Sequence, residues 1–501
     1  MKGCFLLQRN FAYIGQYLAQ TLQKKYGVEE FCGYVSLRRS YDFLKNQKDI
    51  QYSALLLDEE IHKEYTEAVL DLPFLKTLEM EYGIPTLWRF IAVDRTVMHN
   101  QLVREYPYDT PPYTHEEILK ITQVKAKKIL EFIETEKPDF LFASVVGSIG
   151  SLLLFHIAKK KGIQTLVVHP TLIKDTYTLS ETYNSFTYVD ALFDKEKNTP
   201  QISQESYARA RAFLETFRKN AHPHWELGDP KRQPVTRAQQ LSFLKPSNLY
   251  RILRWMFVSI KDHVTHEDRH DFNYIGPWNY IRDGVRRKLR NIRGVSDLYD
   301  TFEPKEDCVF FPLHYEPEIS LSLYAPFVPD QISAVKQVAR ALPVGYVLYV
   351  KEHPAMVPYR PRRFYQELKK IPNVRLIDPR ITSFEILPHA KLITTITGST
   401  GWEATLFGKP VITFGDIFYN KLSFVKNCET PKDLPWLVKE QLEVFRYNEE
   451  ELISYIAALF EESATTRLQY LWEIETDEEK RRKGLEPLAA LIAKKVHAVR
   501  N

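Results

Sequence analysis

Three ionisable residues stand directly after an apolar segment that is typical of a buried strand. The stretch YVLYVKEHPAM, residues 346–356, runs from apolar residues into Lys351, Glu352, His353 and Pro354. In a parallel sheet, the residues just beyond the carboxyl end of a strand face the ligand crevice. A lysine suits a phosphate as a point charge, and a histidine exchanges a proton near neutral pH. Pro354 restricts His353 and would hold its imidazole in one direction. The alternative is an exposed polar loop.

A glycine-rich turn further along the chain offers the other half of a phosphate site. Gly398, Ser399, Thr400 and a second glycine stand between an expected strand and a short helix that contains Glu403. Glycine lets the backbone approach a ligand closely, the hydroxyls can donate, and the first N–H groups of the helix have no partner within it. Glu403 could cap this helix or accept hydrogen bonds from a ribose or a base. The alternative is an ordinary N-cap made by Ser399 or Thr400.

A third cluster follows the first apolar segment of the C-terminal half. In FPLHYEPE, residues 311–318, His314, Glu316 and Glu318 occupy alternate positions after an expected strand. A histidine and carboxylates in this place could contact a sugar or a nucleotide, and we assign them to sugar or acceptor binding. A mononuclear metal site is the alternative, but this spacing does not specify one, so no metal is expected.

The N-terminal half supplies the candidates for a catalytic carboxylate. Glu79 and Glu81 lie in LEMEYG and Asp94 lies in AVDR, and we select Glu81 and Asp94 as candidate general bases. Each of these residues also fits a structural role when it is considered singly. Other polar residues stand after or near expected strand ends: Gln8, Arg9, Ser144, Ser148 and His169. Of these, we select Arg9 for acceptor binding.

Apolar periodicity in the N-terminal half predicts an open α/β sheet. Apolar runs at 3–7 and 52–58 predict strands, and the pattern of 114–136 predicts a long amphipathic helix. Thr114 and a glutamate three positions later have the spacing of a capping box. Residues 140–170 read as strand, small-residue turn, helix and strand, which predicts a parallel pair joined by a right-handed crossover.

The C-terminal half predicts a second sheet of the same kind. Between residues 308 and 415, strands and helices alternate at short intervals, as in a doubly wound parallel sheet. Two α/β lobes would place the ligand cleft between them. The expected division is an N-terminal lobe at 1–225, a linker or insertion at 226–304, a C-terminal lobe at 305–430 and a helical tail at 431–501.

The expected linker carries a basic run. YIRDGVRRKLRNIRG, residues 280–294, includes Arg282, Arg286, Arg287 and Arg293 together with two further basic residues. Its simplest interpretation is a solvated helix face. The alternatives are a surface that attracts anionic lipid head groups and one that attracts an anionic glycan.

Composition excludes several classes of protein. The formal net charge of +4, from 68 basic and 64 acidic residues, is too small to indicate a nucleic-acid partner. The four cysteines are widely separated and form no CxxC pair, so we expect neither a zinc site nor disulfides, which fits a reducing cytoplasm. The sequence has no signal-peptide pattern and no run of about 18 apolar residues, so any membrane contact is expected to be peripheral.

The motifs resemble a known family. KEHP, NVRLID, TGSTGWEA and GKPVITFG, in this order between Phe310 and Tyr419, resemble the bacterial capsule polysaccharide biosynthesis family. They resemble more distantly other GT-B transferases with CMP- or CDP-activated donors, such as sialyltransferases, Kdo transferases and polyglycerol-phosphate polymerases. The resemblance implies a GT-B-like α/β fold, with two Rossmann-like, doubly wound lobes facing a central cleft and a helical C-terminal tail.

The resemblance also implies roles for the motif residues. In the wider group, a His-Pro pair and a later Ser/Thr pair bind the phosphate and cytidine of the donor nucleotide. These pairs match His353 with Pro354 and Ser399 with Thr400, and Glu403 matches the acidic residue that follows. With Lys351 and Gly398, they form the expected donor-nucleotide site, and His353 is also selected as a catalytic residue. The acidic-acidic-glycine motif that supplies the base in sialyltransferase-like groups has no match here, and EMEYG is the nearest approach.

The implied function is transfer of a sugar in capsule or surface polysaccharide assembly. The expected donor is a nucleotide-sugar, with a CMP-linked Kdo-like or sialic-acid-like sugar as the leading candidate, and the expected acceptor is a glycan or glycolipid. No cofactor and no metal are expected. The expected location is cytoplasmic, with peripheral contact at the inner face of the cell membrane or with a capsule assembly complex. Two alternatives stay open: an enzyme similar to UDP-N-acetylglucosamine 2-epimerase, and a non-catalytic nucleotide- or carbohydrate-binding component of such a complex.

Overall fold

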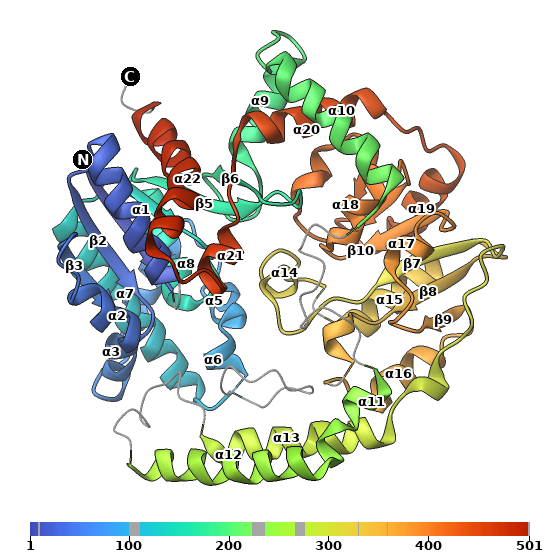
Figure 1. Cartoon of the computed structure of the whole chain (residues 1–501), viewed down its shortest axis with the longest axis horizontal. Helices are drawn as coiled ribbons and strands as arrows, with labels where there is room; N and C mark the ends of the chain where they lie inside the picture. Colours follow the sequence, from blue (N-terminus) through green and yellow to red (C-terminus); the bar gives the residue numbers. More distant parts are fainter. Residues whose placement is uncertain are drawn as a thin grey trace. The chain divides into compact units, whose positions relative to one another are not determined.

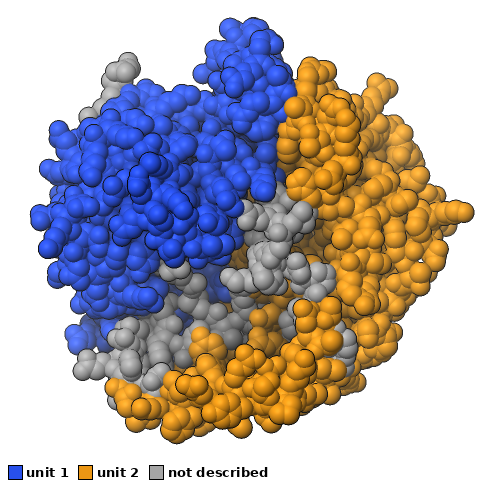
Figure 2. Space-filling model, in the orientation of Figure 1, with its two compact units in different colours: residues 1–98, 111–210, 454–501 blue, residues 99–110, 211–453 orange. Residues whose placement is uncertain are grey.

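The chain forms two compact units, each built on one sheet (Figures 1 and 2). Unit 1 comprises residues 1–98, 111–210 and 454–501, and unit 2 comprises 99–110 and 211–453. The computed structural model describes residues 1–8, 11–99, 111–222, 236–265, 276–328, 330–357 and 359–498.

Unit 1 contains a seven-stranded sheet in the order β13-β6-β5-β4-β1-β2-β3. Strands β1 to β5 pair in parallel, and β6 and β13 extend the sheet with antiparallel pairs. Aromatic side chains of β1, β2 and β4 pack in its core. The rings of Phe5 and Phe31 make an edge-to-face contact, with their centroids 5.5 Å apart. The open α/β sheet predicted from the sequence is confirmed. The strands are β1 (Lys2–Leu7), β2 (Glu30–Val35), β3 (Tyr52–Leu57), β4 (Phe140–Ala143), β5 (Gln164–Pro170), β6 (Thr176–Ser180) and β13 (Ser463–Thr465).

The long helix of unit 1 begins at the predicted capping box. Thr114 caps α7 through a capping box, in which Glu117 accepts the backbone N–H of Thr114 at 2.7 Å. The α-helices of this unit are α1 (Phe11–Tyr26), α2 (Arg38–Lys45), α3 (Asp58–Lys63), α4 (Leu72–Glu81), α5 (Trp88–Val93), α6 (Arg95–Met98), α7 (His115–Glu136), α8 (Ile149–Lys160), α9 (Thr187–Glu196), α21 (Leu468–Glu473) and α22 (Glu478–Ala498).

The C-terminal segment is mostly helical, as predicted, but it also contributes a strand. Strand β13 pairs with β6 at the edge of the unit 1 sheet. The hydroxyl of Thr178 donates to the carbonyl of Glu462 at 2.7 Å, and the Glu462 carboxylate pairs with Lys495 of α22. Strand β13 consists of only three small or polar residues, Ser463–Thr465, which have no periodic apolar pattern. The sequence therefore did not indicate this strand.

Unit 2 contains a six-stranded sheet in the order β12-β11-β10-β7-β8-β9, and all its pairs are parallel. The chain adds strands outward from β7 to β9, then returns to β10 on the other side of β7 and continues to β12. This is the doubly wound topology that the sequence predicts. The strands are β7 (Cys308–Pro312), β8 (Val347–Lys351), β9 (Val374–Ile377), β10 (Leu392–Thr395), β11 (Val411–Thr413) and β12 (Val425–Asn427).

The strands of unit 2 are linked by helices, and two long helices precede the sheet. Both long helices, α12 and α13, lie in the segment expected as a linker or insertion, and α13 contains the basic run. Helices α10 (Gln204–Lys219) and α20 (Glu449–Glu461) contain the residues at which the chain passes from one unit to the other. The other α-helices are α11 (Arg237–Gln240), α12 (Pro246–Thr265), α13 (Pro277–Arg293), α14 (Ile319–Ser322), α15 (Gln331–Ala341), α16 (Arg362–Lys369), α17 (Ser383–Ile386), α18 (Ser399–Leu406) and α19 (Leu434–Glu443).

Short 3-10 helices complete the described structure: η1 (Glu64–Thr66), η2 (Ser242–Leu244), η4 (Ser296–Leu298), η5 (Pro354–Met356) and η6 (Phe418–Lys421). Within the described ranges, no helix combines the length and the apolar character needed to cross a bilayer.

Gly150 permits a close approach that organises the interior of unit 1. A Cβ at this position would lie 1.9 Å from the Tyr34 hydroxyl and 2.9 Å from the Asp58 carboxylate. The Tyr34 hydroxyl donates to Asp58, and the ammonium of buried Lys125 lies 2.5 Å from the same carboxylate. We expect Gly150→Ala to push Tyr34 off Asp58 and to lower the free energy of unfolding by about 2 kcal/mol. Thermal and denaturant unfolding measure this change.

Gly284 is the matched control, because nothing lies within 4 Å of a Cβ built there. It lies inside α13, where alanine is favoured over glycine by about 1 kcal/mol, so Gly284→Ala should not destabilise the protein. Equal stability of the Gly150→Ala protein and the unchanged protein would show that the interior can move Tyr34 without cost.

Candidate donor-nucleotide site

The carboxyl edge of the unit 2 sheet brings the predicted motifs together. Strand β7 lies between β8 and β10, so the direction of strand addition reverses beside it. Ligands of doubly wound sheets bind at this point. The loops that follow β7, β8 and β10 carry His314, His353 and Gly398 respectively. Three segments far apart in the sequence therefore meet at one end of the sheet.

His314 joins the loop after β7 to the loop after β10. Its Nε2 accepts the backbone N–H of Thr397 at 3.1 Å. Its own backbone N–H donates to the Gln331 side chain at 2.6 Å, and the Gln331 amide donates back to the His314 carbonyl at 3.2 Å. Burial lowers the pKa of His314 to about 3, and Arg360 adds to this effect. The neutral imidazole is thus a fixed acceptor that positions the glycine-rich turn that begins at Gly398.

Buried Arg360 joins the loop after β7 to the loop after β8. Its guanidinium lies 2.5 Å from the Glu352 carboxylate and 3.2 Å from that of Glu316, and it donates to the His314 carbonyl at 2.7 Å. The Tyr365 hydroxyl donates to Glu352 at 2.9 Å. Only 1% of Arg360 is exposed. Arg360 and Tyr365 were not selected from the sequence, because PYRPRRF, residues 358–364, shows no periodic pattern that distinguishes one arginine from another.

The orientation of His353 is set by the residues on both sides of it. Its backbone N–H donates to the Glu352 carboxylate at 2.6 Å. It caps η5, in which Pro354 is the first residue, and its Nδ1 accepts the N–H of Ala355 at 3.2 Å. Since Nδ1 accepts, the proton of the neutral ring lies on Nε2, a donor suited to a phosphate oxygen. The ring of Tyr315 lies 5.6 Å from that of His353.

Lys351 and Glu403 form a buried, interacting pair of titratable groups. Lys351 ends β8 and Glu403 lies in α18, and each is 6% exposed. Burial lowers the pKa of Lys351 to about 8, while the charges of Glu403 and Glu352 oppose this shift. Burial likewise raises the pKa of Glu403 to about 8, opposed by Lys351. Buried groups that titrate near neutrality at the ligand end of a sheet are typical of functional sites.

The glycine-rich turn leaves the start of α18 without a side-chain cap. Gly398 is the N-cap residue, so the alternative of an N-cap by Ser399 or Thr400 is wrong, and both residues lie in the first turn. The Tyr419 hydroxyl donates to the Gly398 carbonyl at 2.6 Å. A Cβ at Gly398 would lie 2.7 Å from Thr395 Oγ1, so this close packing requires glycine. The first N–H groups of α18 are therefore suited to an anion.

The remaining residues of the third cluster take different positions. Glu316 points inward to Arg360, as described above. Glu318 is exposed and accepts the Ser320 hydroxyl at 3.0 Å; it is the N-cap residue of α14, but its side chain makes no capping hydrogen bond. In the part of the chain that the structure describes, no group of three or more His, Cys, Asp and Glu residues is arranged to hold a metal ion. Metal independence stays a prediction.

The candidate bases of unit 1 lie in contrasting surroundings. Glu81 is exposed at the end of α4. Asp94 is buried, which raises its pKa. Its Oδ2 accepts the N–H of Ile149 at 3.0 Å, and its Oδ1 accepts those of Thr96 and Val97 at 3.1 Å. These bonds tie α6 to the start of α8, so Asp94 has a structural task there. The catalytic role of either carboxylate stays a prediction.

Several other residues selected in unit 1 also make structural contacts. Glu79 accepts the N–H of Leu87 at 2.7 Å, and Ser148 caps α8 through a capping box with Ser151. A ring nitrogen of His169 lies 3.0 Å from the carbonyl of Thr182. Arg9 lies outside the described residues.

The two sheets define the class of the protein: an α/β protein with two Rossmann-like units. The resemblance to the capsule polysaccharide biosynthesis family is confirmed, because residues 208–429 match the model of that family, described as capsule polysaccharide biosynthesis protein. The matched residues lie almost entirely in unit 2 and include the whole candidate site.

Comparison with individual proteins gives partial likenesses. Protein FixF of Sinorhizobium fredii is 31% identical over 118 residues, which are 22% of this chain and 27% of FixF. The chain thus matches about a quarter of that relative's length.

Comparison with solved structures gives likenesses at low sequence identity. KpsC of Thermosulfurimonas dismutans, a beta Kdo 2,4 transferase, is 14% identical with a TM-score of 0.38, and the likeness covers 67% of this chain and 83% of KpsC. UDP-GlcNAc 2-epimerase from Neisseria meningitidis is 12% identical with a TM-score of 0.28, over 100% of both chains. Because both TM-scores are below 0.5, the fold assignment rests on the two sheets described above.

Arg360→Met tests the network that supports the loops. Two buried carboxylates would lose their only described arginine partner, so we expect unfolding to become easier by about 3–5 kcal/mol. Arg363→Met is the matched control, since the Arg363 side chain is 87% exposed. Adding Glu352→Gln to Arg360→Met should restore part of the loss. An Arg360→Met protein as stable as the control would contradict the network's role.

Glu403→Gln tests the buried carboxyl by the pH dependence of stability. Folded Glu403 keeps its proton up to about pH 8, whereas the unfolded side chain loses it near its ordinary value of 4.5. The unchanged protein should therefore lose stability between these two pH values, and the variant should not lose that contribution. Melting temperatures at pH 5, 6, 7 and 8 should show the variant gaining on the unchanged protein as pH rises. Exposed Glu429→Gln is the control, and a constant difference across the range would refute the burial argument.

Proposed function

We propose that the protein is a glycosyltransferase of capsule or surface polysaccharide assembly that uses a nucleotide-sugar donor. The observation that carries this proposal is the convergence of His353, Lys351 and the uncapped start of α18 at the carboxyl edge of the unit 2 sheet. The match of this unit to the capsule family supports it. The convergence provides hydrogen-bond donors for a phosphate, and the match to the family supports a role in capsule polysaccharide biosynthesis.

The proposed chemistry follows from the charge that develops during transfer. Breaking the bond between sugar and phosphate leaves negative charge on the phosphate of the nucleotide. The Nε2–H of His353, the Lys351 ammonium and the helix N-terminus would stabilise this charge and would do so most strongly as the bond breaks. Ser399 and Thr400, in the first turn of α18, would donate further hydrogen bonds.

We assign Glu403 to the ribose or the base of the nucleotide. Its carboxyl is protonated below about pH 8, so it can donate as well as accept at neutral pH. Its ionisation and the deprotonation of Lys351 both occur near pH 8. Each step makes the site less positive, so nucleotide affinity should fall above this pH.

A carboxylate of unit 1, Glu81 or Asp94, would take the proton from the acceptor hydroxyl. We propose a CMP-linked sugar of the 3-deoxy-ulosonic acid class as the donor, because the motifs resemble those of transferases with CMP-activated donors. The acceptor would be a glycan or glycolipid, and the reaction would take place in the cytoplasm without a metal or cofactor.

A ligand screen followed by a transfer assay tests the proposal. CMP, CDP, UDP and GDP are compared for the rise in melting temperature, because a ligand that binds only the folded state stabilises it. The nucleotide that binds then identifies the donor sugars to be assayed with glycan acceptors. His353→Ala should lower the transfer rate about 100-fold or more, as loss of one charge-stabilising donor does. Exposed His389→Ala should leave the rate unchanged.

Other outcomes distinguish the alternatives. An epimerised sugar formed without any acceptor would indicate an epimerase, and nucleotide binding without turnover would indicate a binding component. Wild-type transfer by a folded His353→Ala protein would remove His353 from the donor site.

A further inference from the structure

Exposed apolar side chains concentrate in one helical pair of unit 2. More than half of the large apolar residues exposed in the described chain lie between Leu244 and Ile292. Phe257 of α12 is 71% exposed and Trp278 of α13 is 65% exposed. Scattered exposed apolar residues need no explanation, but a concentration of this kind marks an interaction surface. This pair, α12 (Pro246–Thr265) with α13 (Pro277–Arg293), is called the amphipathic pair below.

In α12 the exposed apolar residues form one stripe. Leu249, Leu253, Phe257 and Val264 follow helical spacing and lie on one face, with exposures between 51% and 71%. Tyr250 lies beside them and is 67% exposed. The opposite face is less exposed. The stripe therefore points away from the neighbouring structure.

In α13 a second stripe is bordered by arginines. Trp278, Val285, Leu289 and Ile292 recur at helical spacing and are 48% to 65% exposed. Helical geometry places three basic residues along one side of this stripe: Arg282, Arg286 and Arg293. The whole helix carries six basic residues and one acidic residue. It combines an apolar stripe with a strong positive charge, as helices that lie on anionic bilayers do.

The ring contacts within the described residues of the pair leave both stripes uncovered. Between α12 and α13, the ring centroids of Trp255 and Tyr280 lie 5.9 Å apart in an edge-to-face contact. Lys288 of α13 lies 5.3 Å from the ring centre of Phe243 in η2, which precedes α12. The stripes stay exposed in the described structure.

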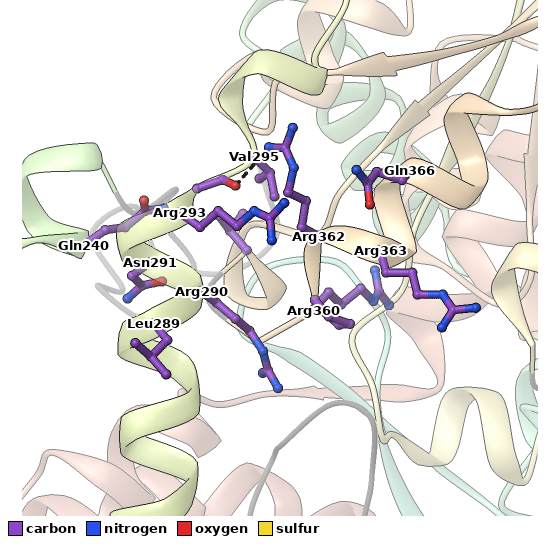
Figure 3. A pocket seen from close by; sticks show the side chains of 13 residues that line it. Gln240, Leu289, Arg290, Asn291, Arg293, Val295, Arg360, Arg362, Arg363 and Gln366 are labelled. Atoms are coloured by element: carbon purple, nitrogen blue, oxygen red, sulfur yellow. Dashed lines mark hydrogen bonds between the residues drawn. The ribbon is translucent and has the colours of Figure 1, made fainter.

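An arginine-rich cavity of about 370 Å³ adjoins the C-terminal end of α13 (Figure 3). No carboxylate is among the described residues that line it. Helix α16 (Arg362–Lys369) begins here after Pro361, and no side chain caps it. Leu289 of the α13 stripe is also part of the lining. The basic residues in the lining are Arg290, Arg293, Arg360, Arg362 and Arg363.

The arginines of the cavity differ in the partners that their guanidinium groups contact. Arg362 pairs with Asp297, and Arg290 donates to the carbonyl of Tyr359 at 2.5 Å. The Nε of Arg360 is buried and has no hydrogen-bond partner in the described structure, although the rest of its guanidinium is bonded. Arg363 is 87% exposed. A buried N–H without an acceptor, beside an uncapped helix start and several arginines, points to an anion such as a phosphate.

We propose that the amphipathic pair docks on an anionic phospholipid surface, with its apolar stripes among the head groups and a lipid phosphate in the arginine cavity. Charge complementarity favours lipid over a second copy of the chain, because two α13 surfaces would bring like charges together. Each basic residue near an anionic membrane adds about 1 kcal/mol of attraction, and the stripes add apolar contact. The surface does not use the proposed catalytic residues, so it can be tested without transferase activity.

Vesicle sedimentation tests the proposal on the full-length protein. We expect binding to vesicles of equimolar phosphatidylcholine and phosphatidylglycerol, little binding to phosphatidylcholine alone, and weaker binding at high salt. The double variant Leu253→Ser with Phe257→Ser should bind at least about tenfold more weakly, since two large apolar contacts are lost. The control is Trp436→Ser, which removes a residue of α19 that is 72% exposed and should leave binding unchanged.

A second pair of variants tests the cavity and the source of the phosphate. Arg293→Gln with Arg363→Gln should weaken binding to the mixed vesicles severalfold, whereas exposed Arg340→Gln of α15 should not. Unchanged melting temperatures show that the variants are folded. Thermal stabilisation by inorganic phosphate without vesicle binding would overturn the lipid assignment. So would equal binding to both kinds of vesicle, or a dimer that the Leu253 and Phe257 substitutions dissociate in the absence of lipid binding.

Discussion

A buried arginine between two buried carboxylates holds the candidate donor site in place. Removing three charges from water is costly, and the cost is offset only because Arg360 pairs with both Glu352 and Glu316 at close range. These partners belong to the loops after β8 and β7. Glu352 in turn accepts the N–H of His353. The direction of the imidazole therefore depends on a side chain that itself has no place in the proposed chemistry.

The other half of the site depends on a neutral histidine. His314 is kept uncharged by burial and accepts the N–H of Thr397, immediately before the turn at Gly398. Gly398 then starts α18 without a side-chain cap, which leaves helix N–H groups for a ligand. One charged network and one neutral acceptor thus position two loops around the same end of the sheet. Lys351 at the end of β8 and Glu403 in α18 are both buried. This burial moves the pKa of each side chain to about 8.

The residues of the candidate site that follow strand ends can be recognised in the sequence, whereas those that act through long-range contacts cannot. KEHP and the glycine-rich turn were found because each follows a short apolar run, a signal that needs only neighbouring residues. Arg360 was missed, since its importance comes from partners in two other segments and nothing in PYRPRRF marks it. The alternative of an N-cap by Ser399 or Thr400 is wrong, because α18 already begins at Ser399 and its N-cap residue is Gly398. The edge strand β13 had no periodic signal at all.

The sequence by itself determined the two α/β sheets and the resemblance to the capsule family, because apolar periodicity and ordered motifs are local properties of the chain. It also determined that α13 would be strongly basic. Only the tertiary structure decided which charges are buried and which apolar residues remain exposed. Burial of His314, Lys351 and Glu403 comes from packing between distant segments, and it moves their pKa values. Exposure of the stripe on α13 likewise depends on what packs against the helix, which no spacing of residues within the helix can specify.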